Sequence, residues 1–158
     1  MKDAQPRAIL LSEYRVPEFL VSHVDLHVTL GDETTRVRSR LAVARNPASA
    51  VQDGPLRLNG QALALRSLAL DGRPLAAQEY GYDGEELVIA GVPARFVLES
   101  EVELRPQDNT ALEGLYRSRS MFCTQCEPEG FRRITFFPDR PDVLSLYSTT
   151  IVAERARY

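Results

Sequence analysis

The 158-residue sequence is poor in the side chains that most often carry catalysis, with two histidines, two cysteines and no tryptophan. It contains no His-Glu-x-x-His motif, so a self-contained hydrolytic zinc site or a Ser-His-Asp triad has few residues to draw on. No apolar run approaches the roughly 18 residues of a membrane span, and the run at residues 8–11 is too short for a secretory signal. These absences favour a binding or accessory domain in a reducing cytoplasm.

The formal net charge of −3 argues against a nucleic-acid-binding surface, which usually shows as a basic domain. Nearly all basic residues are arginines, and Arg36, Arg38 and Arg40 alternate along a predicted strand. Such a stripe is typical either of an anion-binding surface or of a solvated strand face. Because Asp32 and Glu33 lie beside the stripe and the total charge is acidic, we favour the solvated face.

Apolar and polar residues alternate over residues 19–30, where Val24, Leu26 and Val28 share one face. This period of two predicts a half-buried strand. A second alternating segment at residues 34–45 follows a turn, so we predict a β-hairpin.

Further short apolar runs follow at regular intervals, with Asn-Gly and Asp-Gly turns between them. Turns at this spacing are typical of an all-β fold, an antiparallel sandwich or barrel. One run, rich in leucine and alanine, would also fit a helix by periodicity, but its length of eight residues and its flanking turns favour a strand. The runs lie at residues 56–58, 63–70 (the ambiguous one), 86–90 and 95–104.

The pattern changes after residue 109. Residues 111–117 and 145–157 have strand character, whereas residues 121–142 are rich in phenylalanine and follow neither strand nor helix period. An irregular, aromatic-rich segment within a regular sheet protein is a candidate functional loop.

Cys123 and Cys126 form a C-x-x-C motif, which is found in redox pairs and in halves of zinc sites. A redox motif normally opens a helix in a βαβ unit, which this sequence does not predict. The remaining candidate ligands, His23 and His27, lie four apart on a predicted strand, so their Cα atoms are about 13 Å apart at roughly 3.3 Å per residue. One metal ion is therefore not expected to bind both histidines, and we predict solvent-exposed histidines and two buried, reduced thiols.

Charged residues of both signs occur within the irregular segment. Arg132, Arg133, Asp139, Arg140 and Asp142 are predicted to form ion pairs that fix the segment. Taken alone, the two glutamates of its Glu-Pro-Glu sequence would be surface carboxylates.

Residues 122–135 read Phe-Cys-Thr-Gln-Cys-Glu-Pro-Glu-Gly-Phe-Arg-Arg-Ile-Thr, and residues 139–144 read Asp-Arg-Pro-Asp-Val-Leu. Together they resemble the signature of the bacterial aminopeptidase N family of zinc-dependent alanyl aminopeptidases, which runs close to T-Q-C-E-x-E-G-F-R-x-I-T and then D-R-P-D-V-L. Residues 109–116 resemble the strand that leads into this signature, and residues 14–17 match near the start. The resemblance covers the whole chain and is most specific after residue 109.

The resemblance implies that residues 1–158 form the N-terminal domain of a longer gluzincin metallopeptidase, a saddle-shaped β-sandwich that packs on a thermolysin-like catalytic domain. In the family, the zinc ligands and the general base lie in that catalytic domain, which is absent from this sequence. It also implies a chain that is C-terminally truncated within its first domain. The fragment alone should then bind no metal and be inactive, and an edge strand left unpaired would let it self-associate.

The resemblance also implies two substrate-binding residues, Gln125 and Glu127, and no catalytic residue in this chain. An aminopeptidase must recognise a free α-ammonium group, whose pKa is about 7.7–8.0, and a carboxylate in a water-poor pocket attracts it. In the family, a glutamate at the position of Glu127 does this, and a glutamine at the position of Gln125 lines the same pocket. Because family structures tend to have a cis peptide after this glutamate and proline lowers its cost, we predict that Glu127–Pro128 is cis.

The sequence alone is also consistent with two other functions. One is a stand-alone β-sandwich module that binds proteins through its loops. The other is a zinc or redox protein built on Cys123 and Cys126, which metal analysis of the purified chain would test.

Overall fold

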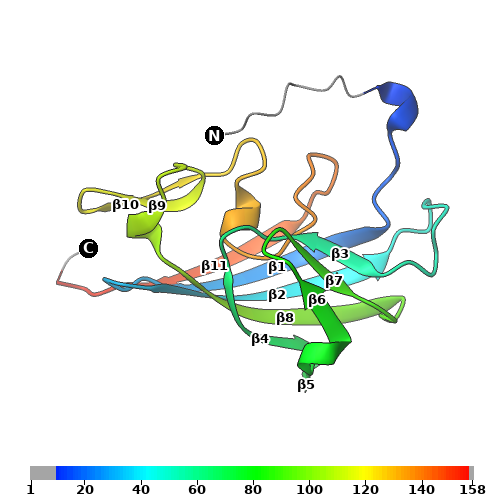
Figure 1. The fold of residues 1–158 in the computed structure, drawn as a ribbon, viewed down its shortest axis with the longest axis horizontal. Coiled ribbons are helices and arrows are strands. Elements are labelled where there is room, and N and C mark those ends of the chain that lie inside the picture. Colours follow the sequence, from blue (N-terminus) through cyan, green and yellow to red (C-terminus); the bar gives the residue numbers. More distant parts are fainter. Residues whose placement is uncertain (1–9, 157–158) are drawn as a thin grey trace.

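The computed structural model describes residues 10–156, which form strands, turns and short 3-10 helices. Figure 1 shows a curved six-stranded sheet, in the order β11-β1-β2-β8-β4-β5, with a three-stranded sheet, β3-β7-β6, on one face and a β9-β10 hairpin at one end. The predicted all-β class is confirmed. The strands are β1 Phe19–Thr29, β2 Thr35–Arg45, β3 Leu56–Asn59, β4 Ala64–Leu70, β5 Arg73–Pro74, β6 Tyr80–Tyr82, β7 Glu86–Ile89, β8 Arg95–Leu104, β9 Gly114–Ser118, β10 Met121–Gln125 and β11 Leu146–Val152, and the 3-10 helices are η1 Leu11–Glu13, η2 Ala77–Glu79, η3 Pro106–Asp108 and η4 Phe131–Arg133.

The predicted hairpin is formed by β1 and β2, with Val28 opposite Val37. A β-bulge shifts the register between Val21 and His23, so that two consecutive residues of β1 face solvent before the alternation resumes. The bulge keeps Val21 and Val24 on the same, buried face although they are three residues apart. The ambiguous leucine-rich run is a strand, β4, which pairs with β8.

Three local predictions need correction. The sheet is not wholly antiparallel, because β11 pairs with β1 in parallel, with His23 opposite Leu146. The strand expected at residues 111–117 begins only at Gly114, because Leu112 adopts a positive φ angle of 57°, which lies outside the β region. The segment at residues 121–142 is irregular only after residue 125, since its first five residues form β10.

The hydrophobic core lies between the two larger sheets. Leu41 and Leu98, from the central strands of the six-stranded sheet, are each 1% exposed, and Leu58 and Leu87 from the three-stranded sheet are equally enclosed. Phe136 is fully buried in the same core, with its ring edge-on to Tyr82 at 5.0 Å. The aromatic residues that made residues 121–142 a candidate functional loop therefore serve largely to close the core.

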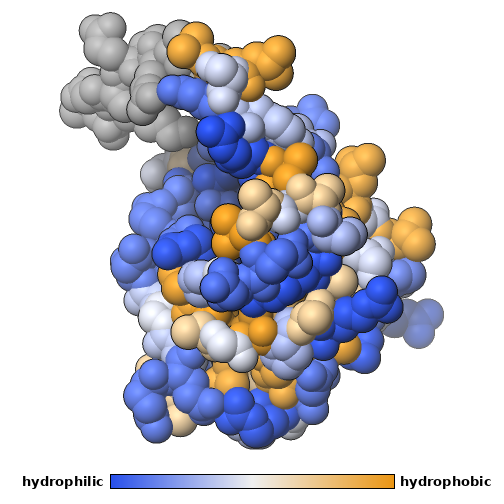
Figure 2. Space-filling model, turned by 90° about the vertical axis from the view of Figure 1, so that its right-hand side faces the viewer, coloured by the Kyte–Doolittle hydropathy of each residue, from blue (hydrophilic) through white to orange (hydrophobic). Residues whose placement is uncertain are grey.

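One end of the molecule has a mainly hydrophilic surface (Figure 2). Viewed from the end opposite the β9-β10 hairpin, hydrophilic side chains predominate and apolar ones are scattered among them (Figure 2). Within residues 10–156, no helix is long and apolar enough to cross a membrane.

Candidate functional site

The signature segment begins on β10 and passes through a turn into η4, which Figure 1 places between the β9-β10 hairpin and the three-stranded sheet. Its aromatic residues point inward. Phe131 packs edge-on against Phe137 at 5.1 Å, and the backbone of Phe137 pairs with that of Asn59 at the end of β3. The segment is therefore fastened to the sandwich just after η4.

An enclosed ion pair joins the two halves of the signature. The Nε of Arg132 lies 3.0 Å from Oδ2 of Asp139, and both side chains are 13% exposed. The same carboxylate oxygen accepts the backbone N–H of Arg132, while Nη2 of Arg132 donates to the carbonyl of Asp139 at 3.0 Å. The backbone N–H of Asp139 in turn donates to Oδ1 of Asn59. This pairing confirms part of the predicted ion-pair set and ties it to β3.

A buried chain of hydroxyl groups makes a second connection. Thr135 is fully buried and donates from Oγ1 to Oγ of Ser39 on β2, which lies 2.8 Å from Oγ of Ser100 on β8. Each of these enclosed hydroxyls has a partner, as buried polar groups require. Ser39 and Ser100 were not predicted from the sequence, where their only signal is a serine at an inward position of each strand.

A third connection holds the segment before β1. The hydroxyl of Tyr14 donates to Asp142 at 2.9 Å, and Arg140 donates to the same carboxylate and to the carbonyl of Arg15. The Arg140 hydrogen bonds hold the pKa of Asp142 below its ordinary value, whereas the hydrogen bond to Asp142 raises the pKa of Tyr14. The remaining member of the predicted set, Arg133, pairs instead with Glu113 at 3.2 Å.

The two predicted substrate-binding residues are among the signature residues that lie on the surface. Gln125 ends β10, and Glu127 follows in the turn; both side chains are exposed. The amide of Gln125 donates from Nε2 to the backbone carbonyl of Glu127 at 2.8 Å, so the two residues are linked. The predicted cis peptide between Glu127 and Pro128 is confirmed.

The two glutamates of the turn have different surroundings. The carboxylate of Glu129 lies 3.6 Å from Nη1 of Arg132, although its side chain is 61% exposed. Glu127 has no hydrogen bond or ion pair through its carboxylate to any described residue. Of the two negative charges, Glu127 is therefore the one that remains available to an incoming cation.

The cysteines and histidines do not come together into a metal centre. Cys123 and Cys126 are free thiols, and both are partly exposed, so the prediction that they are buried is wrong. Burial raises the pKa of the Cys126 thiol, and the nearby Asp139 and Glu127 raise it further, which disfavours the thiolate that a metal or a redox reaction needs. Among residues 10–156 no group of three or more His, Cys, Asp or Glu side chains could hold a metal ion.

Two arginines of the stripe are paired with acidic residues on the neighbouring strands β1 and β8. Arg36 contacts Glu101 and Glu103, and Arg40 lies between Asp25 and Glu99. A cross-strand ladder of opposite charges confirms the solvated strand face.

Several surface cavities occur in the described part of the chain. None of four cavities of about 320 to 610 Å³ is lined by Gln125 or Glu127. One cavity of about 500 Å³ is a groove between β11 and the β9-β10 hairpin, which no pattern in the sequence predicts. Apolar side chains predominate in this groove; its lining consists of Leu26, Val28, Leu30, Leu115, Met121, Phe122, Thr124, Ile134, Thr149, Ile151 and Ala153.

Comparison with curated protein sequences shows which proteins this chain is similar to. The chain is 51% identical over 154 residues to aminopeptidase N from Caulobacter vibrioides and 43% identical over 156 residues to aminopeptidase N from Escherichia coli. Each match covers 98% of the chain, but only 18% and 17%, respectively, of the relative. No family model matches the sequence.

Solved structures give the same result. A Legionella pneumophila aminopeptidase A, crystallised with aspartic acid, matches with a TM-score of 0.87 and 33% identity over 94% of the chain and 17% of its own length. An M1 zinc metallopeptidase from Deinococcus radiodurans, with a TM-score of 0.70 and 16% identity over 92% of the chain and 35% of its own length, shares the fold. The fold is thus that of the N-terminal domains of M1 aminopeptidases. More narrowly, the chain belongs to the aminopeptidase N family.

Proposed function

We propose that this chain is the N-terminal domain of a zinc-dependent aminopeptidase and that its Gln125–Glu127 turn anchors the α-ammonium group of the peptide substrate. The observation that carries the proposal is the division of the signature. Arg132, Thr135 and Asp139 are used inward, while Gln125 and Glu127 are presented at the surface. Signature side chains that are exposed on a loop are candidates for binding.

Charge makes Glu127 suited to this role. A free N-terminus is distinguished from an internal peptide by its ammonium group, and a carboxylate rewards that group with a charge-assisted hydrogen bond. Arg132 lies beside Glu129 but makes no ion pair with Glu127. The carboxylate of Glu127 is therefore available to pair with the ammonium group of the substrate. Gln125 adds an amide next to the carboxylate and holds the turn through the carbonyl of Glu127.

The peptide-cleaving chemistry is proposed to lie outside this chain. The described residues do not form a zinc site, so the metal, its ligands and the general base are assigned to a catalytic domain of the same, longer polypeptide. In that domain zinc would supply Lewis acidity to the scissile carbonyl and activate water. The isolated chain is accordingly proposed to be inactive, and its partners are the catalytic domain and the substrate N-terminus, with no nucleic acid or membrane.

The gene sequence beyond the codon for Tyr158 tests this assignment. A downstream His-Glu-x-x-His with a glutamate about twenty residues later is expected from zinc-ligand spacing in such peptidases. A stop codon directly after Tyr158 would refute the proposal and favour a stand-alone binding module.

The role of Glu127 is tested by kinetics in the full-length protein. Glu127→Gln removes the negative charge and keeps the size, and the loss of one hydrogen bond to a charged group, about 1.5–3 kcal/mol, lowers kcat/KM by about 10- to 150-fold. Glu129→Gln is the matched control, because its carboxylate already faces Arg132, and should change kcat/KM little. Equal effects of the two substitutions would contradict the role of Glu127.

We further propose that the 158-residue chain works in the cytoplasm, where its two free thiols stay reduced, and that it self-associates when isolated. Every residue of β11 is exposed, and its outer edge has no neighbouring strand among the described residues. Leu146–Val152 contains no charged residue and no proline, which are the usual means of blocking an edge strand.

A further inference from the structure

Two glycines lie in direct contact beneath the Gln125–Glu127 turn. Gly130, just before η4, donates its backbone N–H to the carbonyl of Cys126 at 3.0 Å. Gly114, the first residue of β9, lies against it, so that a Cβ on Gly114 would be 2.9 Å from the carbonyl oxygen of Gly130. We call this pair the glycine contact.

Gly130 is required by space and not by backbone conformation. Its φ of −91° and ψ of −18° are ordinary right-handed values that any residue adopts. A Cβ on Gly130, however, would lie 2.3 Å from the carbonyl oxygen of Gln125 and 2.8 Å from Cα of Cys126. Both of these atoms belong to the backbone, so no flexible side chain can move aside.

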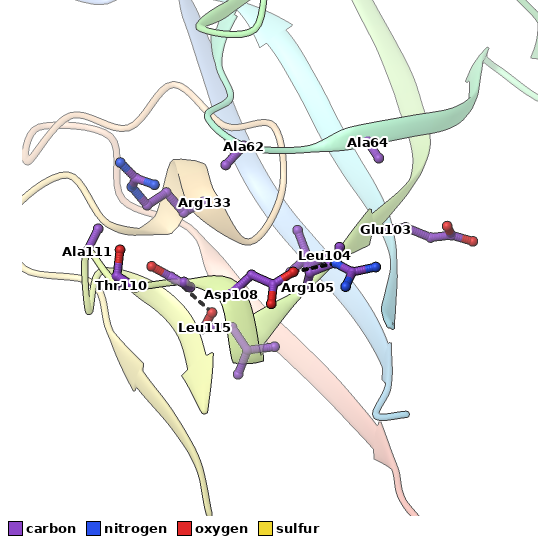
Figure 3. A pocket seen from close by; sticks show the side chains of 11 residues that line it. Ala62, Ala64, Glu103, Leu104, Arg105, Asp108, Thr110, Ala111, Leu115 and Arg133 are labelled. Carbon is purple, nitrogen blue, oxygen red and sulfur yellow. Dashed lines mark hydrogen bonds and ion pairs between the residues drawn. The ribbon is translucent and has the colours of Figure 1, made fainter. Parts of the chain in front are cut away.

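Gly114 closes the contact from the other side. Its φ is +69°, and a Cβ there would also lie 2.6 Å from Cβ of Arg133. Arg133 projects from η4 (Figure 3) and, with Ala111 and Leu115, lines a cavity of about 320 Å³. Gly114, against which Gly130 packs, is therefore itself held in place by Arg133 of η4.

We infer that Gly130 is a positioning residue for the substrate amine, because its missing side chain sets the height at which Gln125 and Glu127 stand above the sandwich. This inference rests on the proposed function. A methyl group at residue 130 would have to open the gap of 2.3 Å to at least about 3.0 Å, which moves the carbonyl of Gln125 by about 0.7 Å. The hydrogen bond from the Gln125 amide to the carbonyl of Glu127 transmits that movement to the carboxylate.

The test is Gly130→Ala in the full-length enzyme, with Gly81→Ala as the matched control. Gly81 has no positive φ, and a Cβ there meets no atom within 4 Å. Because a misplacement of about 1 Å can cost about 100-fold in rate or binding, Gly130→Ala should raise KM for aminoacyl substrates at least about tenfold. Its kcat should stay within about threefold, and Gly81→Ala should leave both constants unchanged.

A double-mutant cycle separates positioning from a general structural effect. If Gly130 acts through Glu127, adding Gly130→Ala to Glu127→Gln should change KM by less than about threefold. An undiminished effect in that background, or a fall in kcat as large as the rise in KM, would overturn the inference. If Glu127→Gln alone leaves KM unchanged, the proposed function fails; if it raises KM while Gly130→Ala behaves like Gly81→Ala, only the positioning role fails.

Hydrogen exchange in the unmodified 158-residue chain keeps the inference testable should Gly130→Ala fail to fold. The Gly130 amide, bonded to Cys126, should exchange as slowly as amides in β1 and β2. Exchange as fast as at the amide of Gly84, an exposed turn residue, would show that the contact is not fixed and would overturn the inference.

Discussion

Removing the carboxylate of Asp139 should be far more damaging than its place in a surface segment suggests. The side chain is 13% exposed and accepts two hydrogen bonds from Arg132, one from Nε and one from the backbone N–H. In Asp139→Ala the guanidinium of Arg132, equally enclosed, keeps only the carbonyl of residue 139 and the exposed Glu129 carboxylate at 3.6 Å. Breaking a buried pair by removing one partner costs about 3–5 kcal/mol, and we expect about 3 kcal/mol because Glu129 remains nearby.

Chemical and thermal denaturation of the 158-residue chain measures this effect. For a domain of this size 1 kcal/mol corresponds to about 2–4 °C, so Tm should fall by about 6–12 °C. Asp108→Ala is the control, since its ion pair with Arg105 is 62% and 57% exposed and should leave Tm unchanged. A second variant, Asp139→Leu combined with Arg132→Met, removes both charges and should recover part of the loss. A loss below about 1 kcal/mol in Asp139→Ala would refute the argument that this pair fastens the signature segment.

Three further predictions concern the core, the pH dependence and the exposed edge. Phe136→Ala should lower the free energy of unfolding by about 3–5 kcal/mol, measured by urea denaturation, because the ring is fully buried against Tyr82; a loss under 1 kcal/mol would contradict this packing. The pKa of Asp142 is lowered by Arg140, so its stabilisation is present above the ordinary value of 3.8 and is lost as pH falls through the lower folded-state pKa; Asp142→Asn should therefore flatten the acid limb of a Tm–pH profile, and an unchanged slope would be evidence against it. Ile151→Lys places a charge on β11 and should convert self-associated chain to monomer in sedimentation experiments; unmodified chain that is monomeric at high concentration would disprove self-association.

The regular part of the fold could be predicted because its strands obey a simple alternation. Val24 and Leu41 occupy the inward positions of two long strands joined by a turn, and they are buried as the pattern requires. The bulge in β1 also has a signal in the sequence, since Ser22 and His23 are two consecutive polar residues that shift the alternation by one. The shift in alternation is visible in the sequence. It produces a bulge because both halves of β1 bury their apolar residues in the same core.

The remainder depends on contacts between distant residues. Nothing in the residues of β11 distinguishes a parallel from an antiparallel partner. Its parallel pairing with β1 depends on the path of residues 131–143, which bring the chain back to the start of β11. The chain before β9 is held by Asn109, whose side-chain amide donates to the carbonyl of Glu113, just before the strand, and to that of Leu115 within it. Such side-chain hydrogen bonds compete with regular structure and have no periodic pattern.

The candidate site shows why a family signature is more informative than the residue types within it. Taken one at a time, Glu127 and Glu129 are equivalent surface carboxylates, and no composition or spacing separates them. The structure separates them through Arg132, which is held by Asp139 and lies close enough to contact Glu129. The buried residues of the signature thus determine the surroundings of the exposed ones. Arg132, held by Asp139, pairs with Glu129, and Glu127 is left as the one carboxylate of the segment without a partner among the described residues. A substitution at Arg132 would consequently be expected to alter amine recognition even though its side chain is not itself presented to the substrate.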